Sequence, residues 1–203
     1  MLLRSLLAAI LVALALPAAA QNPPDGTPIR VRGTVDKLDG QTLVVKSRDG
    51  ASVTVALAAN FVVRAVVAKN LSDIKPGDFV ASTSLKGSDG KLKAIELHIL
   101  PEELRGRIEG QIPWDLVPDS LMTNATVARI LSAPEGRVMK VAYKGNEAEI
   151  IVPDGVPIVG YAPGDPSLLK PGATVFVFAR KQADGSLVAA QVTAEKDGIK
   201  PPM

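Results

Sequence analysis

The fold is decided by a stretch of sequence that occurs twice. Asp73-Ile74-Lys75-Pro76-Gly77 is followed by Asp89-Gly90, and Leu168-Leu169-Lys170-Pro171-Gly172 is followed by Asp184-Gly185. The two Lys-Pro-Gly turns and the two Asp-Gly turns are each separated by 95 positions, without a gap. The apolar pattern that follows the second turn also agrees between the two places. Repetition at a fixed period predicts two copies of one structural unit.

Within each copy, apolar and polar residues alternate at a period of two. In the first copy, Ile29 and Val31 alternate with Arg30 and Arg32, as is typical of strands with one buried face. Asp-Gly pairs separate such runs, because glycine readily adopts the positive φ that tight hairpins need. A single helical turn is expected at residues 70–74, where Asn70 or Ser72 can cap it.

This pattern predicts an all-β protein of two tandem small OB-like β-barrels. Each barrel is expected to contain five or six antiparallel strands and one short helical turn, and closure removes the strand edges that pair between molecules. The expected organisation is a signal peptide at 1–20, a leader at 21–27, a first barrel at 28–99, an irregular bridge at 100–122, a second barrel at 123–195 and a C-terminal tail at 196–203.

The N-terminus has the pattern of a secretory signal. Arg4 precedes an apolar run of 11 residues, Leu6 to Leu16, which is shorter than the roughly 20 residues that span a bilayer as a helix. Small residues up to Ala20 suit cleavage there. We therefore expect a periplasmic or secreted protein with no transmembrane segment in the mature chain.

Composition narrows the chemistry that this chain can perform. The 203 residues contain no Cys and one His, which excludes zinc-thiolate sites, iron–sulfur clusters and cysteine nucleophiles. Removal of Arg4 with the signal leaves a net charge of +1, because the whole chain has 23 basic and 21 acidic side chains. With only 3% aromatic residues, this near-neutral chain lacks the cationic, aromatic groove of single-strand nucleic-acid binders. We expect no nucleic-acid partner and no cofactor.

The chain resembles exported bacterial proteins that carry tandem copies of a β-rich, OB-like domain of unknown function. The resemblance covers nearly the whole mature chain, and the residues that carry it are Arg32-Gly33-Thr34-Val35, the two Lys-Pro-Gly turns, Pro113-Trp114-Asp115-Leu116 and Met122-Thr123-Asn124-Ala125-Thr126-Val127. These motifs are turns and strand starts. Members of that family are sometimes labelled as metal-transporter components, but the resemblance implies no agreed activity and no catalytic residues.

His98 follows Glu96 on one face of a predicted strand, opposite Leu97. One interpretation makes His98 a metal ligand assisted by Glu96, Glu102 and Glu103. Transition-metal sites usually gather several nitrogen or sulfur donors, however, and the matching position in the other copy is Thr193. We therefore expect His98 to lie on the solvent-exposed surface.

The bridge at 100–122 is the most unusual segment, because neither helical nor strand periodicity runs through it. It contains the only Trp of the chain, Trp114, beside Asp115, and it follows Arg105 and Arg107. Long connections inside compact proteins are usually functional or disordered. Trp114 either docks between the barrels, which we favour, or lies exposed and stacks on a sugar or a partner.

These observations predict a non-enzymatic binding protein. Its expected partner is an envelope protein or glycan, held through the bridge and the groove between the barrels, with Trp114, Asp115, Arg105 and Arg107 as the binding residues. The alternative is a metal-binding accessory protein that uses His98 and the acidic residues named with it. No catalytic constellation is recognisable in the sequence.

Overall fold

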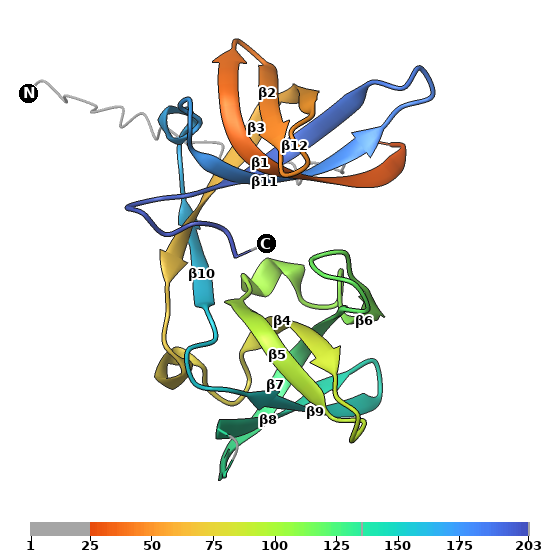
Figure 1. Cartoon of the computed structure of the whole chain (residues 1–203), viewed down its shortest axis with the longest axis vertical. Helices are drawn as coiled ribbons and strands as arrows, with labels where there is room; N and C mark the ends of the chain where they lie inside the picture. Colours follow the sequence, from red (N-terminus) through yellow and green to blue (C-terminus); the bar gives the residue numbers. More distant parts are fainter. Residues whose placement is uncertain (1–24, 135, 203) are drawn as a thin grey trace, which may run out of the picture.

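The computed structural model describes residues 25–134 and 136–202, and this part of the chain is all-β (Figure 1). The strands of the first half are β1 (Thr27–Asp39), β2 (Thr42–Ser47), β3 (Ser52–Ala68), β4 (Phe79–Lys86), β5 (Leu92–Ile99) and β6 (Gly110–Pro113). Those of the second half are β7 (Leu121–Ala133), β8 (Gly136–Tyr143), β9 (Asn146–Val152), β10 (Ile158–Pro163), β11 (Thr174–Lys181) and β12 (Leu187–Ala194). Three 3-10 turns connect them: η1 (Leu71–Asp73), η2 (Glu102–Leu104) and η3 (Pro166–Leu168).

Five strands form a closed barrel in the upper part of Figure 1, which we call barrel A. β1 pairs with β2 and β11, β2 pairs with β3, and β12 closes the ring by pairing with both β11 and β3. Its interior is filled by branched aliphatic side chains, among them Leu43, Val55 and Val177, which are fully buried. Close packing of such residues is the main source of stability in a barrel of this size.

A second group of five strands, which we call barrel B, occupies the lower part of Figure 1. β4 pairs with β5 and β7, β8 pairs with β7 and β9, and a short parallel contact between β5 and β9 completes the ring. Leu97, Met139 and Ile150 are fully buried in its separate core.

Each barrel takes strands from both halves of the chain, which corrects the expected domain boundaries. Barrel A combines β1, β2 and β3 with β11 and β12, whereas barrel B combines β7, β8 and β9 with β4 and β5. Strands within 28–99 therefore do not close a barrel among themselves, and neither do those within 123–195. β4 and β5 of the first half complete barrel B, and β11 and β12 of the second half complete barrel A.

The length of β3 explains this exchange. β3 has 17 residues and spans about 55 Å at the usual rise per residue. Its first part pairs with β2, and residues up to Ala65 pair with β12 inside barrel A, while its end, from Arg64 to Ala68, pairs with β10. β3 and β10 thus run side by side between the lobes (Figure 1). β3 bulges against β12 between Leu57 and Val62, but it does not turn back, so β4 begins in the other lobe.

Elements that follow the crossing strands match between the two halves at the spacing seen in the sequence. η1, β4 and β5 begin and end 95 positions before η3, β11 and β12 respectively. The helical turn expected at residues 70–74 is confirmed as η1, where the Asn70 backbone N–H donates to the Asp73 carboxylate at 2.8 Å. Its neighbour Ile74 is buried in the core of barrel B.

The bridge at 100–122 is more regular than expected. η2 lies near its start, and β6 pairs antiparallel with the first residues of β7, from Gly110 opposite Asn124 to Pro113 opposite Leu121. The bridge is irregular apart from η2, β6 and the first two residues of β7. β6 was not predicted because its four residues are too few for a strand period to be visible in the sequence.

The expected signal peptide at 1–20 lies outside the described residues, and so does most of the leader at 21–27. Within residues 25–134 and 136–202, no helix has the length and apolar character needed to cross a bilayer.

The strand exchange predicts that the two halves of the chain stay together when the connection between them is cut. A protease recognition sequence inserted after the exposed Gly106 separates β1–β5 from β6–β12. After cleavage, both fragments should co-elute in size-exclusion chromatography without denaturant. Their urea midpoint should rise with protein concentration, because unfolding now releases two molecules. Separate elution of two folded halves would contradict the observed pairing.

Candidate ligand-binding cavity

A cavity of about 450 Å³ lies between the two barrels. Barrel B contributes one wall through β4, β5 and β7, and barrel A contributes the opposite wall through β11 and β12. The side walls come from β3, β10 and the bridge. Apolar lining residues are Ala81, Leu100, Leu104, Ile108, Ile112, Trp114, Met122, Phe176 and Phe178. Polar lining residues are Arg64, Glu96, His98, Asn124, Tyr161, Gln191 and Thr193.

The pleat of β5 places Glu96 and His98 on the cavity side. Leu97, between them, points into the core of barrel B and is fully buried. Glu96 lies opposite Thr83 of β4, and His98 lies opposite Ala81. Side chains of successive residues leave opposite faces of a strand, so this register brings all four cavity-side residues together.

The structure corrects the prediction that His98 is solvent-exposed. His98 is only 4% exposed and Glu96 only 1% exposed. Sequence alternation correctly separates their face from that of Leu97, but the second face of β5 is covered by barrel A and the bridge. A strand that is buried on both faces has no solvent-exposed side, so its polar side chains are buried as well.

Glu96, His98 and Tyr161 form a polar chain at one end of the cavity. The Thr83 hydroxyl donates to Glu96 Oε1, and His98 Nε2 lies 3.5 Å from Glu96 Oε2. On its other side, His98 Nδ1 is 2.7 Å from the Tyr161 hydroxyl. Desolvation raises the pKa of Tyr161, and the negative charge of Glu96 raises it further. The phenol therefore stays protonated at neutral pH.

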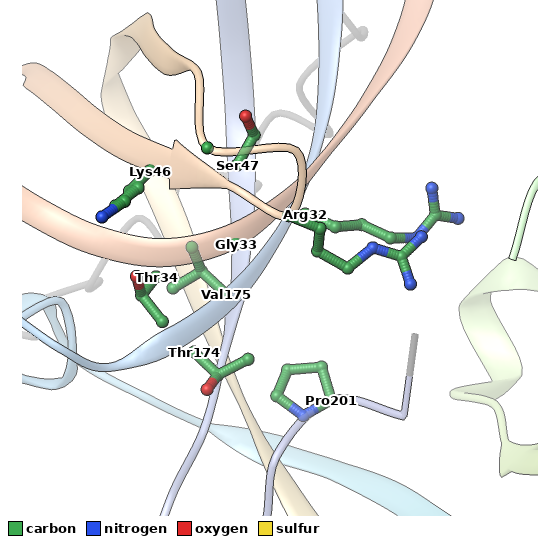
Figure 2. A pocket seen from close by; sticks show the side chains of 10 residues that line it. Arg32, Gly33, Thr34, Lys46, Ser47, Thr174, Val175 and Pro201 are labelled. Carbon is green, nitrogen blue, oxygen red and sulfur yellow. The ribbon is translucent and has the colours of Figure 1, made fainter.

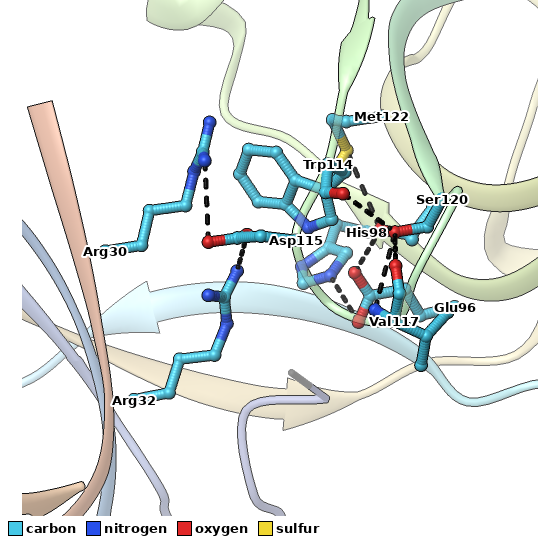
Figure 3. A network of polar contacts seen from close by, with 10 residues as sticks. Arg30, Arg32, Glu96, His98, Trp114, Asp115, Val117, Ser120 and Met122 are labelled. Atoms are coloured by element: carbon cyan, nitrogen blue, oxygen red, sulfur yellow. Dashed lines mark hydrogen bonds and ion pairs between the residues drawn. The ribbon is translucent and has the colours of Figure 1, made fainter. Parts of the chain in front are cut away.

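Two atoms of this Glu96–His98–Tyr161 group are buried without a hydrogen-bond partner among the described residues; the other three such atoms are Nε of Arg30, Nε of Arg32 and Nε1 of Trp114. The two in this group are Glu96 Oε2 and His98 Nε2, whose 3.5 Å separation is too long for a good hydrogen bond. Leaving a polar atom buried and unpaired costs about 1–3 kcal/mol, and more for a charged one. Both side chains are drawn in Figure 3, and the Thr83 hydroxyl that donates to Glu96 also lies 3.9 Å from Met122 Sδ.

The bridge is fastened to barrel A by two arginines of β1. The guanidinium of Arg30 lies over the ring of Trp114, 4.0 Å from its centroid. Arg32, which is 7% exposed, donates from Nη2 to Asp115 Oδ1 at 2.8 Å, and Arg30 Nη1 lies 3.5 Å from Asp115 Oδ2 (Figure 3). Arg32 also lies over the ring of Phe176. Of the two arrangements that the sequence left open for Trp114, this is the docked one.

Arg105 and Arg107, the other two expected binding residues, do not line the cavity. Arg105 donates to the Gly77 carbonyl at 2.8 Å and to the Thr126 hydroxyl, and its guanidinium lies over the ring of Phe79. Arg105 thus holds η2 against barrel B, whereas Arg107 is exposed.

The expected metal ligands are only partly brought together. Glu96 and His98 are adjacent, but Glu102 pairs with Arg105, and Glu103 Oε1 accepts from Arg64 Nη2 at 3.1 Å. Within the described residues, no group of three or more His, Asp or Glu side chains is placed to hold a metal ion. Two donors are fewer than the metal centres of proteins normally use.

Sequence reasoning missed Tyr161, Arg30 and Arg64 as cavity or bridge contacts. Arg30 carries a signal in the sequence, because it shares the outer face of β1 with Arg32 and the two charges are available to pair with another segment. In the structure that segment is the bridge. Tyr161 carries no such signal, because it reaches His98 only through the packing of β10 beside β5.

A second hollow, of about 420 Å³, lies on barrel A beside Gly33 (Figure 2). A Cβ atom on Gly33 would lie 2.0 Å from the Lys46 carbonyl oxygen, so the close approach of β1 and β2 requires glycine there. Arg32 points out of this hollow toward the bridge, where Asp115 pairs with it. Arg32 is thus paired with the bridge and does not offer its charge to a ligand in this hollow, so we assign no site to it.

Comparison with protein-family models, curated proteins and solved structures found no match for this chain. The resemblance to exported proteins with tandem β-rich domains therefore stays a prediction. The case for a function depends on the geometry of the cavity.

Replacing Trp114 with Ala should lower the free energy of unfolding by about 2 kcal/mol. The variant loses the apolar contact of the indole and the cation–π contact with Arg30. Urea unfolding followed by circular dichroism measures this change. Trp114→Phe is the matched control, since it keeps a ring beneath Arg30 and should lose less than half as much. Wild-type stability in Trp114→Ala would show that the indole is not docked.

Asp115→Asn should lower the free energy of unfolding by about 1 kcal/mol at pH 7, because Arg32 is buried and loses its charged acceptor. Burial raises the pKa of Asp115, but the hydrogen bond from Arg32 and the charges of Arg32 and Arg30 outweigh this, so the pKa lies below its ordinary value of 3.8. A carboxylate whose pKa is lower in the folded state than in the unfolded state stabilises the fold at pH values above its unfolded-state pKa. This stabilisation is lost as the pH falls through the folded-state pKa.

The stability difference between wild type and Asp115→Asn should therefore be constant from pH 7 to about pH 4 and shrink below pH 3.8. Urea titrations at a series of pH values measure it. A difference that grows on acidification would contradict the ion pair.

Proposed function

We propose that this protein is a non-enzymatic binding protein that holds a small, mainly apolar ligand in the cavity between its barrels. The cavity volume of about 450 Å³ falls within the range of small-molecule sites, about 300–1,000 Å³. Such sites combine an apolar lining with a few convergent polar groups. Here Glu96, His98 and Tyr161 converge on one another within the lining.

The observation that carries this proposal is the pair of buried, unpaired atoms, Glu96 Oε2 and His98 Nε2. A protein that needed only a stable core would gain by replacing both side chains with apolar ones of similar volume. Their cost is offset when a ligand supplies the missing hydrogen bonds, as at many binding sites.

The protonation of Tyr161 and the hydrogen bonding of Glu96 favour a binding role over catalysis. Tyr161 is protonated, because desolvation and the Glu96 charge raise its pKa, and a protonated phenol is a weak nucleophile. One oxygen of Glu96 is already occupied by the Thr83 hydroxyl. The metal-binding alternative is weaker still, because Glu102 and Glu103 are engaged by arginines and only Glu96 and His98 remain.

The expected envelope protein or glycan partner is supported less well than a small ligand. Sugars stack on an open aromatic face, whereas Arg30 lies over the Trp114 ring. If the N-terminal segment directs export as predicted, the ligand is encountered in the periplasm or outside the cell.

We further infer that the two barrels are OB-like copies of a duplicated unit that have exchanged their last two strands. The matching bounds of β4 and β11, and of β5 and β12, support this history. It also accounts for the cavity: Gln191 and Thr193 lie on barrel A's wall at the positions of Glu96 and His98 on barrel B's wall. Equivalent faces of the two copies thus enclose the site.

The neutral fluorophore N-phenyl-1-naphthylamine should bind with a stoichiometry of one per chain. Trp114 is the only Trp and lines the cavity, so energy transfer from Trp114 to the bound probe reports occupancy. Ala81→Leu places a larger side chain in the cavity and should weaken binding about tenfold or more.

Ala128→Leu is the matched control, since Ala128 is exposed on β7 and does not line the cavity. Its affinity for the probe should equal that of wild type. Failure of the probe to bind, or equal binding by wild type and a folded Ala81→Leu, would refute the proposed site.

A further inference from the structure

The polar end of the cavity has a geometry that selects one kind of ligand group. Glu96 Oε2 and His98 Nε2 are 3.5 Å apart, and neither has a hydrogen-bond partner among the described residues. A single oxygen atom about 2.8 Å from each would lie within hydrogen-bond distance of both. One ligand atom can therefore satisfy both buried groups at once.

The proton positions follow from Tyr161. Its hydroxyl is protonated, and its described hydrogen-bond partner is His98 Nδ1 at 2.7 Å. The arrangement that satisfies this hydroxyl has Tyr161 donating to Nδ1. A neutral imidazole then carries its hydrogen on Nε2, which makes Nε2 a donor facing the carboxylate acceptor Glu96 Oε2.

The ligand atom must therefore accept from His98 Nε2 and donate to Glu96 Oε2. A hydroxyl does both, whereas an ammonium has no lone pair to accept and a carboxylate has no hydrogen to donate. A carboxylate would also be repelled by the charge of Glu96. Resting on the binding function proposed above, we propose that the ligand is an uncharged apolar alcohol or phenol whose hydroxyl lies between Glu96 and His98.

The remaining charges around the cavity agree with an uncharged ligand. Arg64, which is 18% exposed in its side chain, is paired with Glu103, and the two β1 arginines share Asp115. Each arginine beside the cavity thus already has a carboxylate partner. Among the lining residues, Arg64 is thus compensated, and the charge of Glu96 disfavours an anionic ligand. An ammonium could pair with Glu96 but would oppose the hydrogen on His98 Nε2.

The body of the ligand is expected to be a ring system. Trp114, Phe176 and Phe178 line the cavity with aromatic carbon, and Ile108 and Ile112 of the bridge add aliphatic carbon. Ring systems bury a large apolar area while losing few rotatable bonds, which favours binding in a preformed cavity.

A panel of naphthalenes tests the selectivity: naphthalene, 2-naphthol, 2-naphthoate and 2-naphthylmethylamine, each measured by displacement of N-phenyl-1-naphthylamine from the whole chain at pH 7. We expect 2-naphthol to bind about 10–100-fold more tightly than naphthalene, the range for hydrogen bonds to charged groups. The anion and the cation should both bind more weakly than 2-naphthol. Equal binding of 2-naphthol and naphthalene, or tighter binding of either charged analogue, would overturn the assignment of a hydroxyl.

The double variant Glu96→Met, His98→Phe tests which residues cause the preference. Replacing a buried polar pair with apolar side chains usually preserves folding. The ratio of 2-naphthol to naphthalene affinity should fall to about one, while naphthalene still binds. If this variant does not fold, Glu96→Gln should lower the ratio in a folded protein.

Gln191→Met is the matched control, because Gln191 lines the opposite wall at the position that corresponds to Glu96. Its affinity ratio should stay at the wild-type value, and a fall there would refute the role of Glu96 and His98. If N-phenyl-1-naphthylamine and all four naphthalenes fail to bind, the proposed function itself fails. Binding without selectivity refutes the hydroxyl proposal alone.

Discussion

The uninterrupted strand β3 is the constraint on which the rest of the structure depends. Hydrogen bonds to β2 and β12 hold its residues up to Ala65 in barrel A, and hydrogen bonds to β10 hold its end, from Arg64 onward, beside the other lobe. A strand of 17 residues that never turns back must deliver the chain to a different place from where it began. Both barrels then need strands from both halves, so neither core can be completed by a contiguous segment.

The cavity is a consequence of the same arrangement. Strand pairing places β5 in barrel B and β12 in barrel A, and residues of both strands line the cavity that β3, β10 and the bridge help to enclose. Outer faces of barrels are ordinarily wet and tolerate polar residues. Here the outer face of β5 is covered, so Glu96 and His98 become buried polar groups whose unpaired atoms require partners.

Three arginines hold the bridge over the cavity without occupying it. Arg30 and Arg32 bind Trp114 and Asp115 from the side of barrel A, while Arg105 fastens the start of the bridge to barrel B. Arginine suits this task because its planar guanidinium can stack on a ring and donate to a carboxylate at once. The apolar residues of the bridge are thereby held over the cavity.

Features that depend on neighbouring residues in the chain could be predicted from the sequence alone. The period of two, the Asp-Gly and Lys-Pro-Gly turns and the spacing of 95 positions determined the all-β class, the helical turn η1 and the matched elements of the two halves, because these depend on neighbours in the chain. Tertiary structure decided which half completes each barrel, the burial of His98 and its contact with Tyr161. A strand's alternation shows that it has two faces, but what covers each face depends on residues far away in the sequence.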